Sequence, residues 1–170
     1  MNITLICILF TITIFQTAVI PHLAVLGVTP DLFLIFTIFY SLHVEIKRGA
    51  IVNWICGILK DIFSLGFFGF SAFLLVLVGY VIGLVREFVF KDHPLTQVLI
   101  TFISGIFYGF SYLAFLFIFF EDVKLTGMAQ KTVFSALYSA IVSPLLFFLF
   151  NIFRSKLKIG KSLTFGNKYY

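Results

Sequence analysis

The sequence predicts an all-α integral membrane protein with six transmembrane helices. Hydrophobic residues make up 61% of the 170 residues and Phe alone occurs 25 times, whereas charged residues account for only 11%. A soluble domain is about half apolar and roughly a quarter charged, so this composition is typical of a protein that lies in a lipid bilayer. The apolar residues also fall into six runs separated by charged or glycine-rich breaks, which predicts six membrane-embedded segments.

The first predicted helix, residues 3–20, contains no charged residue. As a helix it would be about 27 Å long, enough to span a bilayer core with its flanks. It lacks the basic start and small-residue cleavage site of a signal peptide, which favours an uncleaved helix. The second helix, residues 32–46, begins after Pro30-Asp31, a favourable helix opening that puts an acid near the positive end of the helix dipole.

The remaining helices are expected at residues 49–65, 69–85, 94–120 and 132–153. A tight turn from Gly66 to Gly69 would join the third helix to the fourth. The fifth would be about 40 Å long, so it should tilt in the bilayer. Residues 1–153 would thus form a single polytopic membrane domain, followed by a basic tail at residues 154–170.

The distribution of Lys and Arg predicts that both termini lie in the cytoplasm. With six spans and an inner N-terminus, the inner loops and the tail hold nine basic residues and the outer loops hold two. Positive residues concentrate on the cytoplasmic side of membrane proteins. Five of the twelve basic residues lie in the tail, which indicates that the tail faces anionic lipid. The net charge of +5 therefore argues less well for nucleic-acid binding.

One face of the third helix carries an unusual stripe of polar and small residues. At roughly 100° per residue, its members share an arc of roughly 100°. They are Ala50, Asn53, Gly57, Lys60, Asp61 and Ser64, and the opposite arc holds Ile51, Val52, Ile55, Ile58, Leu59, Ile62 and Phe63. The stripe predicts a partner-binding or helix-packing face opposite a lipid-facing one.

Charges inside a span are costly and persist where they have a partner or a task. Lys60 could extend outward and pair with Asp31, which opens the second helix at the outer surface. Asp61 could belong to a binding surface or an ion path, or it could anchor helix packing. The packing reading is favoured because an ion path normally needs several such groups.

Catalytic and metal-binding constellations are not found, so no enzyme activity, metal or cofactor is expected. His22, His43 and His93 are far apart in the sequence, and in the predicted topology His22 lies on the opposite side of the membrane from the other two, which disfavours a metal site. Cys7 and Cys56 each lie inside an apolar run and are interpreted as small hydrophobic residues. No nucleophile elbow or phosphate-binding glycine loop is present.

Small residues four apart recur on the last three helices and favour close helix packing. The pairs are Gly79 and Gly83, Gly105 and Gly109, Ser135 and Ser139, and Ala136 and Ala140. Such spacing indicates that helices approach closely, within the chain or with another protein.

A succession of motif residues runs through the first half of the chain: Pro30, Asp31, Gly57, Asp61, Gly66, Gly69, Gly79, Tyr80 and Gly83. This succession resembles that of MreD, the rod shape-determining membrane protein family. The specific part of the resemblance covers about residues 28–86, and Lys60 does not belong to the pattern. The remainder of the chain is similar only in hydropathy and length.

The resemblance implies a non-enzymatic subunit of the bacterial cell-elongation machinery in the cytoplasmic membrane. The implied partners are MreC, the actin-like MreB, and RodA with its transpeptidase partner, with control of cell shape and lateral peptidoglycan synthesis as the role. It also implies a fold similar to the substrate-binding membrane subunits of energy-coupling-factor vitamin transporters.

Two functions therefore remain open, a scaffold that docks MreC and a substrate-binding transporter subunit. The transporter subunits typically carry an Ala-x-x-x-Ala pair on their first helix, where this chain has only Ala18. A pocket for a polar vitamin also needs several convergent polar side chains, which are scarce here. The scaffold is favoured.

Overall fold

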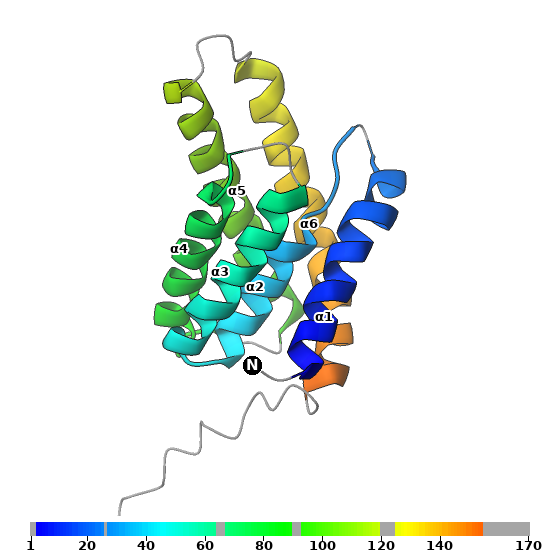
Figure 1. Ribbon diagram of the computed structural model, residues 1–170, viewed down its shortest axis with the longest axis vertical. Coiled ribbons are helices and arrows are strands. Elements are labelled where there is room, and N and C mark those ends of the chain that lie inside the picture. Colours follow the sequence, from blue (N-terminus) through cyan, green and yellow to red (C-terminus); the bar gives the residue numbers. More distant parts are fainter. Residues whose placement is uncertain (1–2, 26, 64–66, 90–92, 120–124, 155–170) are drawn as a thin grey trace, which may run out of the picture.

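The computed structural model describes residues 3–25, 27–63, 67–89, 93–119 and 125–154, and these form an all-helical bundle (Figure 1). Its helices are α1 (Ile3–Ile14), α2 (Leu32–His43), α3 (Ile46–Phe63), α4 (Phe70–Val85), α5 (Pro94–Phe119) and α6 (Leu125–Arg154). Ser64, Gly66 and all of the predicted tail except Arg154 lie outside the described residues. The start of α1 and the end of α6 lie at the same end of the bundle (Figure 1).

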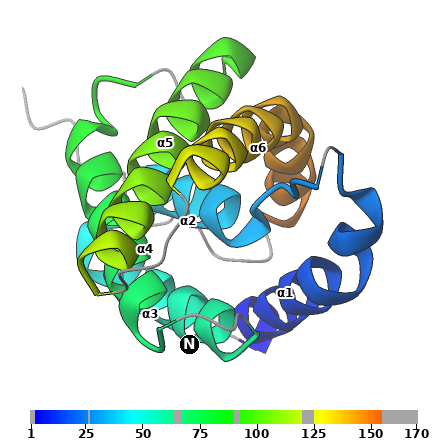
Figure 2. The same ribbon diagram turned by 90° about the horizontal axis from the view of Figure 1, so that it is seen from above.

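Helix α2 is the centre of the molecule. All twelve of its residues are buried, and α3, α4, α5 and α6 contact it. Seen from above, α2 lies inside the ring made by the other helices, with α1 at the edge (Figure 2). A helix of twelve residues is about 18 Å long, too short to cross a bilayer core. Because its neighbours separate it from lipid, its length does not have to match the thickness of the membrane.

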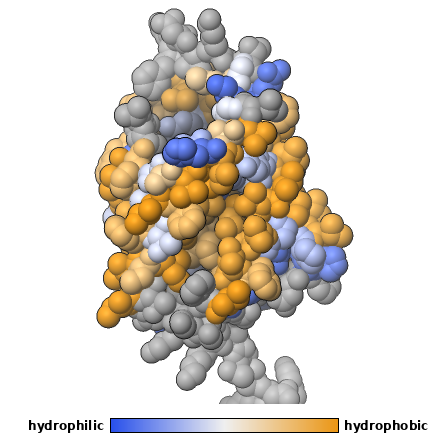
Figure 3. Space-filling view, turned by 90° about the vertical axis from the view of Figure 1, so that its right-hand side faces the viewer, coloured by the Kyte–Doolittle hydropathy of each residue, from blue (hydrophilic) through white to orange (hydrophobic). Residues whose placement is uncertain are grey.

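The outward faces are apolar, the reverse of a soluble protein. Phe10, Ile103, Ile141 and Phe148 are each more than 60% exposed. Figure 3 shows hydrophobic side chains over most of one side of the bundle. A surface with this much exposed apolar area suits lipid and not water.

Among the residues that the structure describes, three segments are long and apolar enough to cross a membrane: Leu5–Leu23, Pro94–Phe119 and Gly127–Ile152. The first includes most of α1, a π-helical turn at Phe15–Val19 and a 3₁₀ turn at Ile20–Leu23. Helices α2 and α4 are apolar but shorter.

The turn between α2 and α3 lies earlier in the chain than expected. The predicted second helix, residues 32–46, ends at His43, because Val44 adopts an extended conformation. The third begins at Ile46 and not at residue 49, and the carbonyl of Glu45 accepts a hydrogen bond from the Gly49 amide. The prediction placed the break between the helices at Lys47 and Arg48. These two basic residues instead lie in the first turn of α3, where their long side chains can reach water.

Helix α6 begins seven residues before the predicted start at residue 132. The apolar run marks only the part of the helix that suits lipid, and polar residues extend the helix beyond it. Pro144 lies inside α6. It cannot donate to the carbonyl of Ala140, and the Ser143 hydroxyl donates to that carbonyl instead, at 2.8 Å. The helix therefore continues through the proline.

Glycines allow the helices to approach closely. A Cβ on Gly57 of α3 would overlap the backbone of Ala72 on α4. On α5, a Cβ on Gly105 would lie 3.0 Å from the Cβ of Ala136 on α6. The small residues identified in the sequence thus serve contacts within the chain, as small-residue spacing does between membrane helices.

We predict that Gly57→Ala destabilises the protein by about 1–3 kcal/mol, because the added methyl group overpacks the α3–α4 contact. Gly127→Ala is the matched control: nothing lies within 4 Å of a Cβ built there, and alanine favours a helix over glycine. Unfolding by sodium dodecyl sulfate, titrated into a mild detergent, measures both. Equal midpoints for the two variants would contradict the close contact.

Candidate functional site

The polar face predicted on α3 is buried against α2 and α4 of the same chain. Asn53 is fully buried and its amide donates to the Ser41 hydroxyl of α2 at 2.9 Å. The face extends further around the helix than expected. Val52, predicted to face lipid, is 5% exposed, and Cys56 is completely buried. Helical geometry found the polar arc, but α2 and α4 together cover a wider arc than the polar residues occupy.

Asp61 binds the start of α4. Its side chain is 3% exposed, and its Oδ2 accepts hydrogen bonds from the amides of Gly69 at 2.7 Å and Ala72 at 3.4 Å. These amides belong to the first turn of α4, where no helical carbonyl is available to them. Asp61 thus caps a neighbouring helix at its positive end. Gly69 has φ +94°, which other L-residues rarely adopt.

The ion pair expected between Lys60 and Asp31 is confirmed. The Lys60 ammonium contacts Oδ2 of Asp31 and also lies 4.0 Å from the ring centroid of Tyr108 on α5. Asp31 Oδ1 accepts a hydrogen bond from the Leu34 amide at 3.1 Å and so caps α2. The two charged side chains retain 19% and 16% exposure, because both line a cavity.

Three further side chains hold the start of α2 and the segment before it. Ser139 of α6 accepts a hydrogen bond from the Asp31 amide at 2.9 Å, and Gln16, in the π-helical turn after α1, accepts one from the Leu32 amide at 2.8 Å. The Ser135 hydroxyl donates to the carbonyl of Thr29 at 2.9 Å. The start of α2 is therefore held by side chains from α6 and from the π-helical turn after α1, as well as by Lys60.

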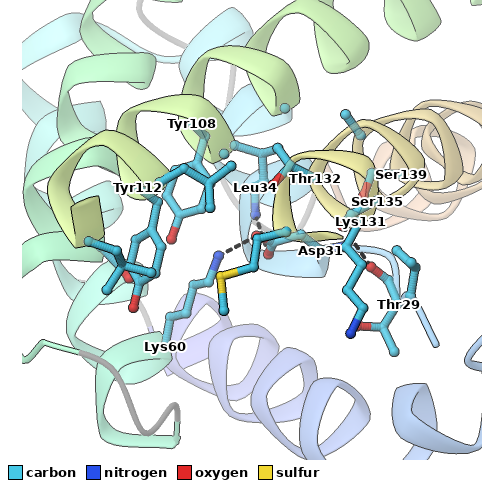
Figure 4. A pocket seen from close by; sticks show the side chains of 18 of the residues that line it. Thr29, Asp31, Leu34, Lys60, Tyr108, Tyr112, Lys131, Thr132, Ser135 and Ser139 are labelled. Carbon is cyan, nitrogen blue, oxygen red and sulfur yellow. Dashed lines mark hydrogen bonds and ion pairs between the residues drawn. The ribbon is translucent and has the colours of Figure 1, made fainter. Parts of the chain in front are cut away.

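The cavity has a volume of about 490 Å³ and lies between the start of α2, the end of α3 and the facing sides of α5 and α6 (Figure 4). Its polar lining includes Asp31, Lys60, Tyr108, Tyr112 and Lys131. In the close-up, the two tyrosines lie on one side of the Lys60–Asp31 pair and Lys131 on the other.

Sequence reasoning did not identify most of this lining. Tyr108 and Tyr112 are four residues apart, a spacing that puts both side chains on one face of a helix. This spacing was a signal in the sequence that could have indicated that the two tyrosines line the same site. Nothing local in the sequence relates Lys131 to Lys60. The cavity contains more convergent polar groups than the composition suggested.

The remaining motif residues are distributed between the packing contacts and the surface. Pro30 is buried ahead of α2. A Cβ on Gly79 of α4 would clash with Asn53 and Ser41, and one on Gly83 with Ile46. Tyr80 is 49% exposed. Within the described part of the chain, no three His, Cys, Asp or Glu residues are grouped to hold a metal ion.

The profile of a family described as rod shape-determining protein MreD matches residues 1–157. No curated protein and no solved structure matches the chain.

We predict that the Lys60–Asp31 ion pair stabilises the bundle, and that each charge contributes to the free energy of unfolding mainly while the other is present. Because the pair is partly exposed, Asp31→Asn and Lys60→Gln should each cost about 1–3 kcal/mol, between the values for surface and buried pairs. The double variant should cost less than the sum of the two. Unfolding titrations of the four proteins measure the coupling, and strictly additive losses would contradict it.

For Asp61 we predict that Asp61→Ala costs about 1–2 kcal/mol, since two amides at the start of α4 lose their acceptor. Asp61→Asn should cost less because it keeps a side-chain oxygen. The exposed acid Glu87, changed to Ala, is the control and should have little effect. A thermal unfolding midpoint for Asp61→Ala equal to that of the control would contradict the capping role.

Proposed function

The chain belongs to the MreD family of rod shape-determining proteins, and from this premise we propose that it is a non-enzymatic membrane scaffold of the bacterial cell-elongation complex. In this role it docks MreC and helps to control cell shape and lateral peptidoglycan synthesis. The family match over residues 1–157 is the observation that carries the proposal. MreB, RodA and the transpeptidase partner of RodA would belong to the same complex.

The use of the polar residues supports a scaffold. Asn53, Lys60 and Asp61 bind groups of the same chain. Such contacts stabilise a fixed arrangement of helices, which suits a protein that positions others. The exposed apolar side chains of α1, such as Ile6 and Phe10, offer a surface at the edge of the bundle on which a transmembrane helix of MreC could pack.

We further propose that all six helices lie within the cytoplasmic membrane, with both termini in the cytoplasm. The bias of basic residues toward that side supports this orientation. The short α2 is compatible with six membrane segments because it is fully buried among longer helices. In this orientation the Lys60–Asp31 pair lies toward the outer surface.

A substrate-binding membrane subunit of a vitamin-type transporter is the second candidate. The cavity beside Lys60 is the observation that favours it, because ligand sites are concave and carry a few convergent polar groups. The absence of an Ala-x-x-x-Ala pair near Ala18 still argues against it.

Affinity purification distinguishes the two functions. We expect the tagged chain, extracted in a mild detergent, to recover the single-span protein MreC in a molar amount close to its own. An unrelated polytopic protein with the same tag and expression level is the control and should recover none. Recovery of an ATPase module without MreC would overturn the scaffold and support the transporter subunit.

A further inference from the structure

We propose that the cavity between α2, α3, α5 and α6 binds an anionic phosphate ester with an apolar portion. This binding is distinct from the scaffold role, which depends on outward-facing surfaces. Three features of the lining carry the inference: an excess of positive charge, several hydrogen-bond donors from different helices, and an apolar wall.

The charge of the lining favours an anion. Lys60 and Asp31 neutralise each other through their ion pair. Lys131 is exposed, also lines the cavity, and forms no ion pair with another residue in the described ranges. The three charged residues of the lining thus sum to one positive charge. In a site with low-dielectric walls, such a charge attracts a negatively charged group.

Donors remain available beside this charge. An ammonium group has three N–H bonds, and that of Lys60 directs one to Asp31 while facing the ring of Tyr108. The hydroxyls of Ser71 on α4 and Thr132 on α6 also line the cavity. Because the donors come from several directions, the tetrahedral oxygens of a phosphate fit them better than a planar carboxylate does.

The rest of the wall is apolar. Leu34, Leu113, Leu116 and Met128 contribute to it, and methionine adapts its shape to a ligand. The volume of about 490 Å³ lies within the usual range for small-molecule sites, about 300–1,000 Å³. The ligand would therefore combine a phosphate with an apolar body of moderate size.

The position of the cavity gives the direction of entry. Its lining includes Gly27, Val28 and Thr29 of the connection between α1 and α2, and Lys131 near the start of α6. Lys131 is exposed and Lys60 retains 19% exposure, so Lys131 lies nearer the mouth. A phosphate there could come from a lipid headgroup or from a soluble phosphate ester.

Thermal unfolding of the purified full chain in a neutral detergent tests the proposal and separates the two sources. The probes are dihexanoyl phosphatidylglycerol, an anionic phosphodiester lipid with two apolar chains, and hexyl phosphate, a soluble phosphate monoester with one short apolar chain. Dihexanoyl phosphatidylcholine, which has the same chains and no net charge, is the control. We expect a saturable rise in the unfolding midpoint with at least one anionic probe and none with phosphatidylcholine.

The lysine variants show whether the rise comes from the cavity. Lys131→Gln should weaken the apparent affinity about fivefold, as expected for one partly exposed charge contact. Lys47→Gln removes the same charge from an exposed position on the first turn of α3, outside the cavity, and should bind as the unaltered protein does.

A response to phosphatidylglycerol alone identifies a lipid, and a response to hexyl phosphate identifies a soluble ester. The proposal is overturned if neither anionic probe raises the midpoint. It is also overturned if phosphatidylcholine acts equally well, or if Lys131→Gln and Lys47→Gln bind alike. MreC recovery does not enter this test, so its outcome is independent of the scaffold role.

Discussion

The structure depends on providing hydrogen-bond acceptors for the first backbone amides of α2, a helix whose residues are all buried. The first amides of α2 cannot reach a carbonyl within their own helix, and Leu32, Phe33 and Leu34 are each at most 6% exposed, so protein groups have to pair with these amides. Asp31 resolves this constraint: its carboxylate caps Leu34 and binds Lys60, while its own amide donates to Ser139. One residue therefore connects α2, α3 and α6 at the point where the backbone most needs partners.

The same logic applies where α3 meets α4. Gly57 lets the two helices approach until Asp61 can reach the amides of Gly69 and Ala72. Close packing and polar pairing are therefore one requirement, since the carboxylate reaches its donors only if the backbones are near. A family motif that combines glycines with acids is understandable on this basis. It fixes how closely α3 and α4 pack, which would suit the scaffold role proposed above.

The sequence predicted those features that depend on residues close in the chain or on charge in an apolar setting. The six helical segments, the polar arc on α3 and the pairing of Lys60 with Asp31 are of this kind. The early end of α2 at His43 and the burial of Val52 and Cys56 depend on neighbouring helices. The cavity could not be predicted, because Tyr108 and Lys131 come to line it beside Lys60 only after α5 and α6 have packed. No local pattern in the sequence encodes that arrangement.

The central position of α2 has a consequence for the order in which the protein is made. Helix α2 leaves the ribosome before α5 and α6, yet Tyr108 and Ser139, which complete its surroundings, lie on those later helices. Until α5 and α6 have been synthesised, α2 is a short helix with an open flank and an incompletely bonded start. The bundle therefore closes around its centre only after α5 and α6 have been synthesised.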